Sequence, residues 1–277
     1  MHSYIFLDLD DTLFQTLRKC PQNATRLEVR ATLADGTPNS YATVQQQWLW
    51  DWLGRGFRIV AVTARDVGAF YRVNLPFQEE VVLNHGAVIL NAHRDIDTQW
   101  QQHILKDLPD YQHKLLTLWQ AIEHYCARHE GFKIRLVNDF DTTWYGVLKH
   151  GAGTETPLQA VLEAVIKHHP LVLSGCLYWH LNGNNLAILP NSIRKENAVR
   201  YLLNRYQQQY PDLITFAAGD SYTDAPFLAL CDYAIIPKNT QLASRLLNET
   251  KTDNASVNHG DYLSIINKSK GAINESL

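Results

Sequence analysis

The stretch YIFLDLDDT, residues 4–12, decides how the rest of the chain is interpreted. Its first four residues are apolar, which predicts a buried strand, and three carboxylates follow almost at once. In an extended chain, side chains two positions apart point the same way, so Asp8 and Asp10 face one site while Leu9 faces the core. Doubly wound parallel sheets form their ligand sites at the carboxyl ends of the strands. The stretch therefore predicts a strand that ends in an acidic site.

Further apolar strands alternate with helical segments at both ends of the chain. The expected strands cover 57–62, 81–83, 213–218 and 233–236, and the expected helices cover 44–53, 67–73, 194–207 and a short segment from 224. Residues 20–42 add a hairpin that turns at Asp35-Gly36. Continuous apolar strands separated by helices indicate a parallel sheet covered on both faces. We therefore predict an α/β fold whose core is a doubly wound parallel sheet, formed by residues 1–86 together with 190–277.

The middle of the chain, residues 87–189, has a different pattern. It predicts helices at 112–129 and 156–168 and hairpins at 132–149 and 177–189, the second turned by NGNN. This order indicates an inserted α+β domain, a small antiparallel sheet with helices on one face. The face expected to pack on those helices carries Phe132, Ile134, Leu136, Leu177, Trp179 and Leu181. The opposite face carries Lys133, Arg135, Tyr145, Lys149, Tyr178, His180 and Asn182. The last thirty or so residues, rich in Asn, Ser and Lys, are expected to be peripheral.

The composition excludes several classes of protein. The formal charge is −3 and no basic cluster interrupts it, whereas nucleic-acid-binding proteins carry a basic stripe that neutralises phosphates. No apolar stretch is long enough to span a bilayer, and the N-terminus lacks the features of a signal peptide. Four widely spaced cysteines without a CxxC pattern favour reduced thiols. We expect a cytoplasmic monomer or homodimer that binds a small molecule rather than nucleic acid or a membrane.

Two segments are suited to binding phosphate. Thr63 ends the strand in FRIVAVTAR, so its hydroxyl and the backbone N–H groups of Ala64 and Arg65 lie at a helix start, which is an anion-binding arrangement. Taken alone, Thr63 is more often expected to be a helix N-cap than a phosphate ligand. Lys195, in NSIRKENAV, opens the helix that returns the chain to the core domain, where a compact positive charge can neutralise phosphate oxygens. Taken alone, it is an ordinary surface lysine.

Four carboxylates are expected at one edge of the sheet. Asp8 and Asp10 follow the first strand, and Asp220 and Asp224, in AAGDSYTDAP, follow another buried strand, where helix capping is the alternative. Gathered together, the four would be strongly unfavourable without a cation. Oxygen ligands without a His or Cys cluster favour a hard ion, and Mg²⁺ is the usual partner of phosphates. A carboxylate in such a site can attack phosphorus, and a second can protonate the leaving oxygen and then activate water.

The segments DLDDT, Thr63, Lys195 and GDSYTD, in this order, resemble the four motifs of the haloacid dehalogenase superfamily over about residues 3–240. The stretch VVLNHGAVIL resembles the strand and NGA turn that precede a type-two cap, as in the Cof-type and sucrose-phosphate phosphatases. The resemblance implies a phosphoric monoester hydrolase with a Rossmann-like core and an inserted cap domain. It also implies Mg²⁺ as the cofactor.

The resemblance implies a role for each motif residue. Asp8 would be the nucleophile and a metal ligand, and Asp10 the acid/base that binds the metal through its backbone carbonyl. Thr63 and Lys195 would hold the phosphate. The metal ligands would be Asp8, Asp10, Asp220 and Asp224, the last directly or through water. Further substrate contacts are expected from Thr12, Ala64, Arg65 and Asn84.

The chain departs from the family pattern at two positions. Thr223 stands where many relatives have the Asn of GDxxND. Its hydroxyl can still bond a phosphate or a metal-bound water, so we expect tuned activity rather than inactivity. His85 interrupts the usual NGA turn, which leaves the role of Asn84 open.

The inserted cap is expected to set specificity. If its polar face closes over Asp8, the side chains of Arg135, Lys149 and His180 would bind a polyhydroxylated phosphate ester, such as a phosphorylated sugar or sugar acid. Plain solvent exposure of that face is the alternative. Transfer of the aspartyl phosphate to a sugar hydroxyl would instead give a phosphomutase or phosphotransferase, which the motifs do not separate from hydrolysis. A catalytically silent metabolite-binding module would be expected to lack Asp8 or a metal carboxylate, and this chain keeps them all.

Overall fold

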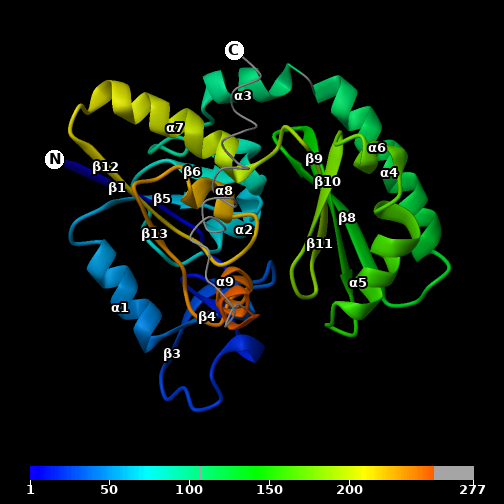
Figure 1. Cartoon of the computed structure of the whole chain (residues 1–277), viewed down its shortest axis with the longest axis horizontal. Helices are drawn as coiled ribbons and strands as arrows, with labels where there is room; N and C mark the ends of the chain where they lie inside the picture. Colours follow the sequence, from blue (N-terminus) through cyan, green and yellow to red (C-terminus); the bar gives the residue numbers. More distant parts are fainter. Residues whose placement is uncertain (107, 253–277) are drawn as a thin grey trace.

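A six-stranded sheet forms the centre of the larger domain in this computed structural model, which describes residues 1–106 and 108–252 (Figure 1). The strands are ordered β13-β12-β1-β5-β6-β7. Their bounds are β1 (His2–Leu7), β5 (Arg58–Val62), β6 (Val81–Leu83), β7 (Val88–Leu90), β12 (Leu213–Ala218) and β13 (Tyr233–Ile235). All neighbours pair in parallel except β6 and β7. The predicted α/β fold with a doubly wound, mainly parallel sheet is therefore confirmed.

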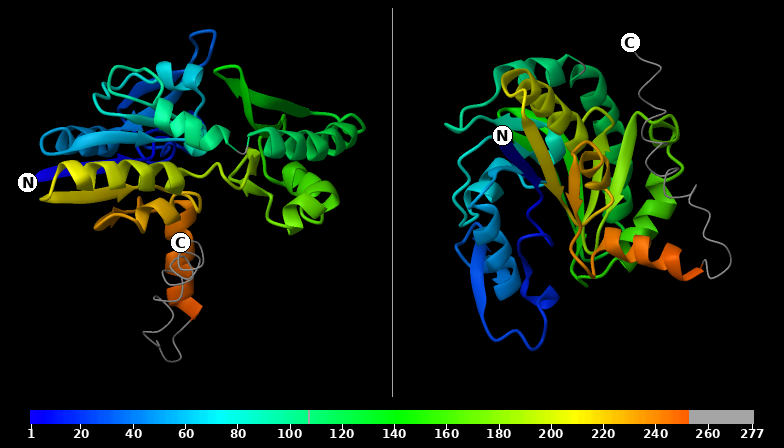
Figure 2. Two further views of the ribbon diagram at one scale, coloured as in Figure 1. Left: turned by 90° about the horizontal axis from the view of Figure 1, so that it is seen from above. Right: turned by 60° about the vertical axis from the view of Figure 1, so that its left-hand side comes forward.

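Helices cover both faces of this sheet (Figures 1 and 2), as right-handed crossovers to either side of β1 require. They are α1 (Val44–Leu53), α2 (Val67–Tyr71), α7 (Lys195–Gln209) and α8 (Ala225–Leu228), whereas α9 (Gln241–Thr252) projects away from the sheet (Figure 2). Because helices lie on both sides, Ile5, Phe6 and Leu7 of β1 are completely buried. The expected hairpin after β1 is present as β3 (Leu27–Thr32) and β4 (Pro38–Thr43), and β2 (Gln15–Thr16) joins it in a three-stranded sheet.

The inserted cap domain is a four-stranded antiparallel sheet in the order β10-β11-β9-β8. Its strands are β8 (Phe132–Asp139), β9 (Thr142–His150), β10 (Leu177–Leu181) and β11 (Leu186–Pro190). Its helices are α4 (Leu108–Cys126), α5 (Thr156–Val161), a π-helical turn (Leu162–Ile166) and α6 (Pro170–Leu173). The helices lie on the outer face of the cap sheet, so its other face is turned toward the core domain (Figure 1). This face is the polar one in the predicted alternation.

Two sequence predictions about the insertion are wrong. The insertion was expected from residue 87, but β7 is the edge strand of the large sheet, where Val88, Ile89 and Leu90 are buried. Helix α3 (Thr98–Leu105) also belongs to the core domain, since the Trp100 indole donates to the carbonyl of Gly86 at 3.0 Å. Trp179 was expected under the cap helices, but it is 36% exposed and lines a cavity. Trp179 lies in the edge strand of the cap sheet, and helices that pack on a small sheet do not cover every side chain of an edge strand.

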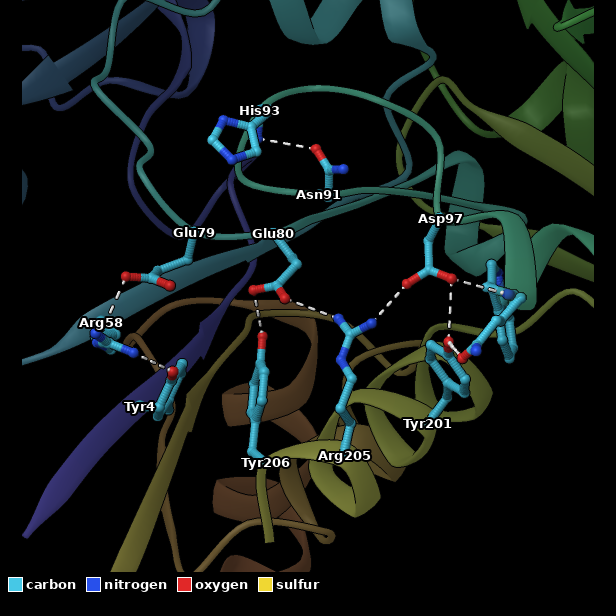
Figure 3. Close-up of polar contacts among 12 residues, drawn as sticks. Tyr4, Arg58, Glu79, Glu80, Asn91, His93, Asp97, Tyr201, Arg205 and Tyr206 are labelled. Carbon is cyan, nitrogen blue, oxygen red and sulfur yellow. Dashed lines mark hydrogen bonds and ion pairs between the residues drawn. The ribbon is translucent and has the colours of Figure 1, made fainter. Parts of the chain in front are cut away.

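Helix α7 is held in register against the core by a polar network (Figure 3). Arg205 donates to Glu80 and to Asp97, each at 2.7 Å, and the Tyr206 hydroxyl donates to Glu80 at 2.6 Å. These side chains are largely buried, and charge-assisted hydrogen bonds in such surroundings are strong and directional. The network fixes how far α7 extends along the sheet. It therefore also fixes the position of Lys195, the first residue of the helix.

Within residues 1–106 and 108–252, no helix has both the length and the apolar character that a bilayer span requires. The segment after residue 252, which was expected to be peripheral, lies outside the described residues.

Gly146 of β9 provides a test of the packing inside the cap. A Cβ at this position would overlap the ring of Trp119 in α4. We predict that Gly146→Ala lowers the free energy of unfolding by about 1–3 kcal/mol, because a packed core accommodates extra volume only with strain. Urea unfolding would measure this. Gly56→Ala is the matched control, since its Cβ would meet nothing within 4 Å. Equal effects at the two positions would contradict the described packing.

Candidate active site

The chemistry-bearing segments converge at the carboxyl edge of the large sheet. Asp8 directly follows β1, Thr63 directly follows β5, and Asp220 lies two residues after β12. The carboxylates of Asp8, Asp220 and Asp224 each offer an oxygen within 4.8 Å of the others, and all three residues are buried. The predicted convergence of acidic side chains from distant parts of the chain is present in the structure.

Lys195 neutralises two of these three carboxylates. Its ammonium donates to Asp8 Oδ1 at 2.7 Å and to Asp224 Oδ1 at 2.6 Å. The Lys195 side chain is 3% exposed, so both contacts are shielded from water. The Thr12 hydroxyl donates to the other Asp8 oxygen at 3.2 Å, which fixes the carboxylate in one orientation. A buried ion pair of this kind is stable only with such additional hydrogen bonds.

The loop after β12 is built around Asp224. The Asp224 Oδ2 atom accepts hydrogen bonds from the backbone and hydroxyl of Ser221, at 2.9 and 2.7 Å, and from the backbone of Asp220 at 3.1 Å. Gly219 is required before this loop, because a Cβ there would clash with the Asp224 side chain. The Thr223 hydroxyl lies 2.9 Å from that of Ser221. Thr223 thus contributes to the loop rather than pointing away from it.

The electrostatics of the cluster leave a deficit of positive charge. Burial raises the pKa of Asp8 to about 7, and the charge of Asp224 adds to the effect while Lys195 opposes it. Burial and the charges of Asp8 and Asp224 raise the pKa of Asp220 to about 9. Burial also acts on Asp224, but Lys195 and the bonds from Ser221 hold its pKa below the usual value. Among the described residues, no side chain donates a hydrogen bond to the Asp220 carboxylate. One lysine, Lys195, thus offsets only part of the negative charge of three carboxylates.

This donor set fits a hard divalent cation. Three carboxylates in reach of one point, without a His or Cys ligand, match the oxygen ligands that Mg²⁺ prefers. Asp10, the fourth predicted ligand, does not contribute its carboxylate to the cluster. Its backbone carbonyl is the group that the family resemblance implies.

The Asp10 carboxylate is bound by Arg65. The two side chains form a bidentate pair, from Nε to Oδ2 and from Nη2 to Oδ1, both at 2.7 Å. Arg65 also donates to the carbonyl of Ala69 at 3.2 Å, and its guanidinium lies over the ring of Phe14. Arg65 was predicted to bind substrate, but in this structure its fork is engaged by Asp10. The residue therefore positions the predicted acid/base.

The segment after β5 is compatible with both roles that the sequence left open for Thr63, a helix cap and a phosphate-binding residue. The Thr63 hydroxyl accepts from the backbone N–H of Arg65 at 3.2 Å, as a cap does, yet Thr63 is also buried beside the acidic cluster. The carbonyl of Ala64 accepts from the Tyr145 hydroxyl of the cap at 2.8 Å. This segment is therefore also a point of contact between the two domains.

The side-chain amide of Asn84 connects the core to the cap, and its predicted contact with substrate stays a prediction. Its amide donates to Asp139 of β8 at 2.7 Å, and the same Asp139 oxygen accepts from the backbone of Val67 at 3.0 Å. Arg135, predicted to bind substrate, pairs with Asp66 at 3.0 Å. Sequence reasoning missed Asp139, although its place at the tip of the 132–149 hairpin was a signal that it could reach the core.

Two predicted cap residues do face the core edge. Lys149 is close enough to Arg135, Asp10 and Arg65 for their charges to act on it, and its pKa is lowered mainly by burial. His180 lies with its ring centroid 6.4 Å from that of His85. Burial and the charge of Lys195 lower the pKa of His180 to about 4. Both side chains therefore lie near groups at the edge of the core, and their predicted contact with substrate stays a prediction.

Two cavities adjoin the cluster. One, of about 620 Å³, is lined by Lys195, Thr223, His85 and His180. The other, of about 950 Å³, is lined by Thr12 and Asp220. Small molecules can therefore approach the acidic cluster from both sides.

The comparisons with known proteins identify the family. The chain matches the haloacid dehalogenase-like hydrolases over residues 5–256, and it belongs to this family. The resemblance to the haloacid dehalogenase superfamily that the sequence indicated is thereby confirmed. Over 80 residues it is 35% identical to a glucosyl-3-phosphoglycerate/mannosyl-3-phosphoglycerate phosphatase of Methanococcoides burtonii. That match covers 28% of this chain and spans about a quarter (26%) of the relative.

Solved structures share the fold across the whole chain. The sucrose-phosphatase of Synechocystis sp. PCC6803, determined with sucrose and phosphate, is 17% identical, with 98% of this chain and 99% of that chain covered and a TM-score of 0.53. The C-terminal domain of a C. albicans trehalose-6-phosphate phosphatase is 14% identical, with 93% and 79% covered and a TM-score of 0.55. The core and its inserted cap are thus an arrangement that occurs in this family.

The raised pKa values of Asp8 and Asp220 predict how pH and metal act on stability. A carboxyl with a higher pKa in the folded state than its ordinary value of 3.8 binds more protons when folded, so the free energy of unfolding falls as pH rises from about 4 toward 9. In a chelator, the unfolding temperature should therefore be lower at about pH 8.5 than at about pH 5.5. Millimolar Mg²⁺ should raise it at the higher pH and act weakly at the lower one.

Differential scanning calorimetry with and without Mg²⁺ checks this prediction. Asp220→Asn is the control, because it removes one titrating carboxyl without changing side-chain size and should reduce the dependence on pH. Equal stabilisation by Mg²⁺ at both pH values would contradict a site formed by these carboxylates.

Proposed function

We propose that this protein is a Mg²⁺-dependent phosphatase that hydrolyses a small phosphorylated metabolite, a phosphorylated sugar or sugar acid, through an aspartyl phosphate on Asp8. The observation that carries the proposal is the buried Asp8 carboxylate, held by Lys195 and Thr12 within a cluster of three carboxylates. The substrate class is supported by the similar proteins, which are phosphatases of sugar phosphates and of glycosyl-3-phosphoglycerates. A cytoplasmic location and a monomeric or homodimeric state stay predictions.

In the first step, an oxygen of the Asp8 carboxylate attacks phosphorus and forms an acyl phosphate bond while the bond from phosphorus to the ester oxygen breaks. Asp10, once one of its oxygens is released by Arg65 and has taken up a proton from water, donates that proton to the leaving oxygen, so the alcohol departs neutral. In the second step, water gives a proton to Asp10 and attacks phosphorus, and the bond to Asp8 breaks. The net reaction converts an ester and water into an alcohol and inorganic phosphate.

The repulsion between the nucleophile and the phosphoryl group must be offset. Lys195 does so directly, because its ammonium lies 2.7 Å from Asp8 and is shielded from water. Asp8, Asp220, Asp224 and the carbonyl of Asp10 are the groups that would hold Mg²⁺. When bound, Mg²⁺ supplies further positive charge at the phosphoryl oxygens. The Thr63 hydroxyl, at the end of β5, is the neutral group available to the phosphate.

Replacement of the nucleophile is the direct test. Asp8→Asn should lower kcat for phosphate release by at least about 10³-fold, because the amide cannot form the acyl phosphate. Malachite-green detection of phosphate from a panel of sugar, sugar-acid, polyol and nucleotide esters would measure it. Asp51→Asn, on the exposed side of α1, is the control with the same change of charge and should retain activity. A fully active Asp8→Asn protein would overturn the mechanism, provided that both variants unfold at a similar temperature.

The pairing of Asp10 with Arg65 gives a second test. Arg65→Lys keeps the charge but loses the bidentate fork, so Asp10 would be poorly aligned. We predict that kcat falls about 10- to 100-fold on an alkyl phosphate and less on p-nitrophenyl phosphate, whose leaving group needs little protonation. Steady-state kinetics on the two esters would show the difference. Arg30→Lys, which pairs with Glu28 away from the site, is the control. Equal losses on both esters would argue against a role through Asp10.

Phosphate release without an added acceptor separates hydrolysis from phosphotransfer. A phosphotransferase would release little phosphate alone and would form a new phosphate ester when a sugar is added. A silent binding module would release none under either condition.

A further inference from the structure

His85 stands out because its conformation is costly and its side chain is buried. The residue adopts φ 57 and ψ 23, in the left-handed region that favours glycine. Its side chain is 3% exposed, and the Nδ1 atom has no hydrogen-bond partner among the described residues. Strained backbone and unsatisfied polar atoms are retained where the surrounding structure requires them, and they cluster at functional sites. The feature therefore needs an explanation from the site.

The turn that carries His85 is wedged between the two phosphate-binding segments. The His85 backbone N–H donates to the carbonyl of Thr63 at 3.1 Å, and that of Asn84 donates to the carbonyl of Arg65 at 2.9 Å. On the other side, a Cβ at Gly86 would overlap the carbonyl of Arg194, next to Lys195. These contacts hold the turn on both sides. The imidazole of His85 thus has a fixed place in the wall of the 620 Å³ cavity, beside Lys195.

A second imidazole faces the first from the cap. The rings of His85 and His180 have centroids 6.4 Å apart at an interplanar angle of 70°, and the ring of Tyr145 lies perpendicular to that of His85 with its centroid 5.1 Å away. Burial and the nearby Lys195 charge lower the pKa of both imidazoles, so both are neutral at physiological pH. A neutral imidazole has one donor and one acceptor. Because a buried N–H without an acceptor is the costlier arrangement, the proton of His85 belongs on Nε2.

The cations of the same cavity are already neutralised. Lys167 pairs with Glu163 at 2.8 Å, and Arg194 pairs with Glu196 at 3.5 Å. Lys195 is held by Asp8 and Asp224. Among the described residues that line the cavity, no lysine or arginine is left without a carboxylate for an anionic group of a substrate. The hydrogen-bonding groups that remain are uncharged or acidic, and both kinds suit hydroxyl groups.

We propose that His85 and His180 bind the leaving group of the substrate, and that this group is uncharged and hydroxyl-bearing rather than a sugar acid. The proposal rests on the proposed phosphatase function and chooses between the two substrate classes that it left open. The two imidazoles, one from the core and one from the cap, form hydrogen bonds to hydroxyl groups of the alcohol that departs. His85 is therefore a specificity-determining residue, and the strain of its turn is the cost of placing an imidazole there.

The test uses pairs of esters that differ in one carboxylate. Sorbitol 6-phosphate is compared with 6-phosphogluconate, and glycerol 3-phosphate with 3-phosphoglycerate, at saturating Mg²⁺ with the full-length wild-type protein. We expect kcat/KM to be about tenfold or more higher for the neutral member of at least one pair, the effect of about one hydrogen bond or of one unpaired charge. If no neutral ester is hydrolysed faster than its acidic counterpart, the proposal is overturned.

Variants then assign the effect to the imidazoles. His85→Gly and His85→Asn both tolerate the left-handed turn, so strain does not distinguish them, but only Asn keeps a side chain that can form hydrogen bonds. We expect His85→Gly and His180→Ala to raise KM for the preferred neutral ester about tenfold more than for p-nitrophenyl phosphate, with a smaller change in kcat, and His85→Asn to recover part of the loss. His93→Ala, a histidine of an exposed loop, is the control.

The outcomes separate the two proposals. If the wild-type protein releases no phosphate from any ester, including p-nitrophenyl phosphate, the phosphatase function fails. If it hydrolyses p-nitrophenyl phosphate but His85→Gly loses activity equally on the aryl and neutral esters, or His85→Asn behaves like His85→Gly, only the assignment of His85 fails. Unfolding temperatures of the variants close to that of the wild type exclude a general loss of structure.

Discussion

The buried contact of Lys195 with Asp8 and Asp224 is the interaction on which the site depends. Three carboxylates gathered at a sheet edge repel one another, and burial increases the repulsion because water no longer screens it. Lys195 reduces the excess by one charge, and a divalent cation would have to balance the remainder together with the charge of an incoming phosphoryl group. Its position is not set locally, because α7 is anchored through Arg205 and Tyr206 at its far end. The contacts at the far end of α7 therefore help to determine where Lys195 lies in the site.

Hydrogen bonds and apolar packing both join the cap to the core. The Tyr145 hydroxyl donates to the carbonyl of Ala64, the Tyr178 hydroxyl donates to that of Ile193, and Asp139 accepts from Asn84. Around these contacts, Val137, Trp144 and Val147 of the cap sheet belong to the same buried apolar cluster as the strands of the large sheet. The position of the cap over the site is therefore set by apolar packing as well as by polar contacts.

The sequence predicted the parts of the structure that follow from strand ends. Asp8 and Thr63 come immediately after buried strands and Asp220 two residues after one, and parallel strands bring their carboxyl ends to one edge of the sheet. The partner of each polar side chain was harder to predict, because the possible partners are distant in sequence and only the folded structure brings one of them close. Arg65 and Asn84 were expected to face a substrate, but Asp10 and Asp139 bind them. The edge position of β7 was also missed, since a three-residue apolar run does not reveal which sheet it joins.

The cap contributes different side chains to the two sides of the site. On the side of Asp10, it contributes Lys149 and Arg135, and the described cations Arg65 and Arg135 pair with Asp10 and Asp66. On the side of Lys195, it contributes His180, which faces His85 of the core. Lys195 lies against Asp8 and therefore acts on the phosphoryl end of a substrate, whereas Asp10 would act on the oxygen of the departing alcohol. The imidazoles of His85 and His180 add neutral hydrogen-bonding groups to the wall of the adjoining cavity. They would orient hydroxyl groups of the alcohol without competing with the carboxylates for the phosphoryl group.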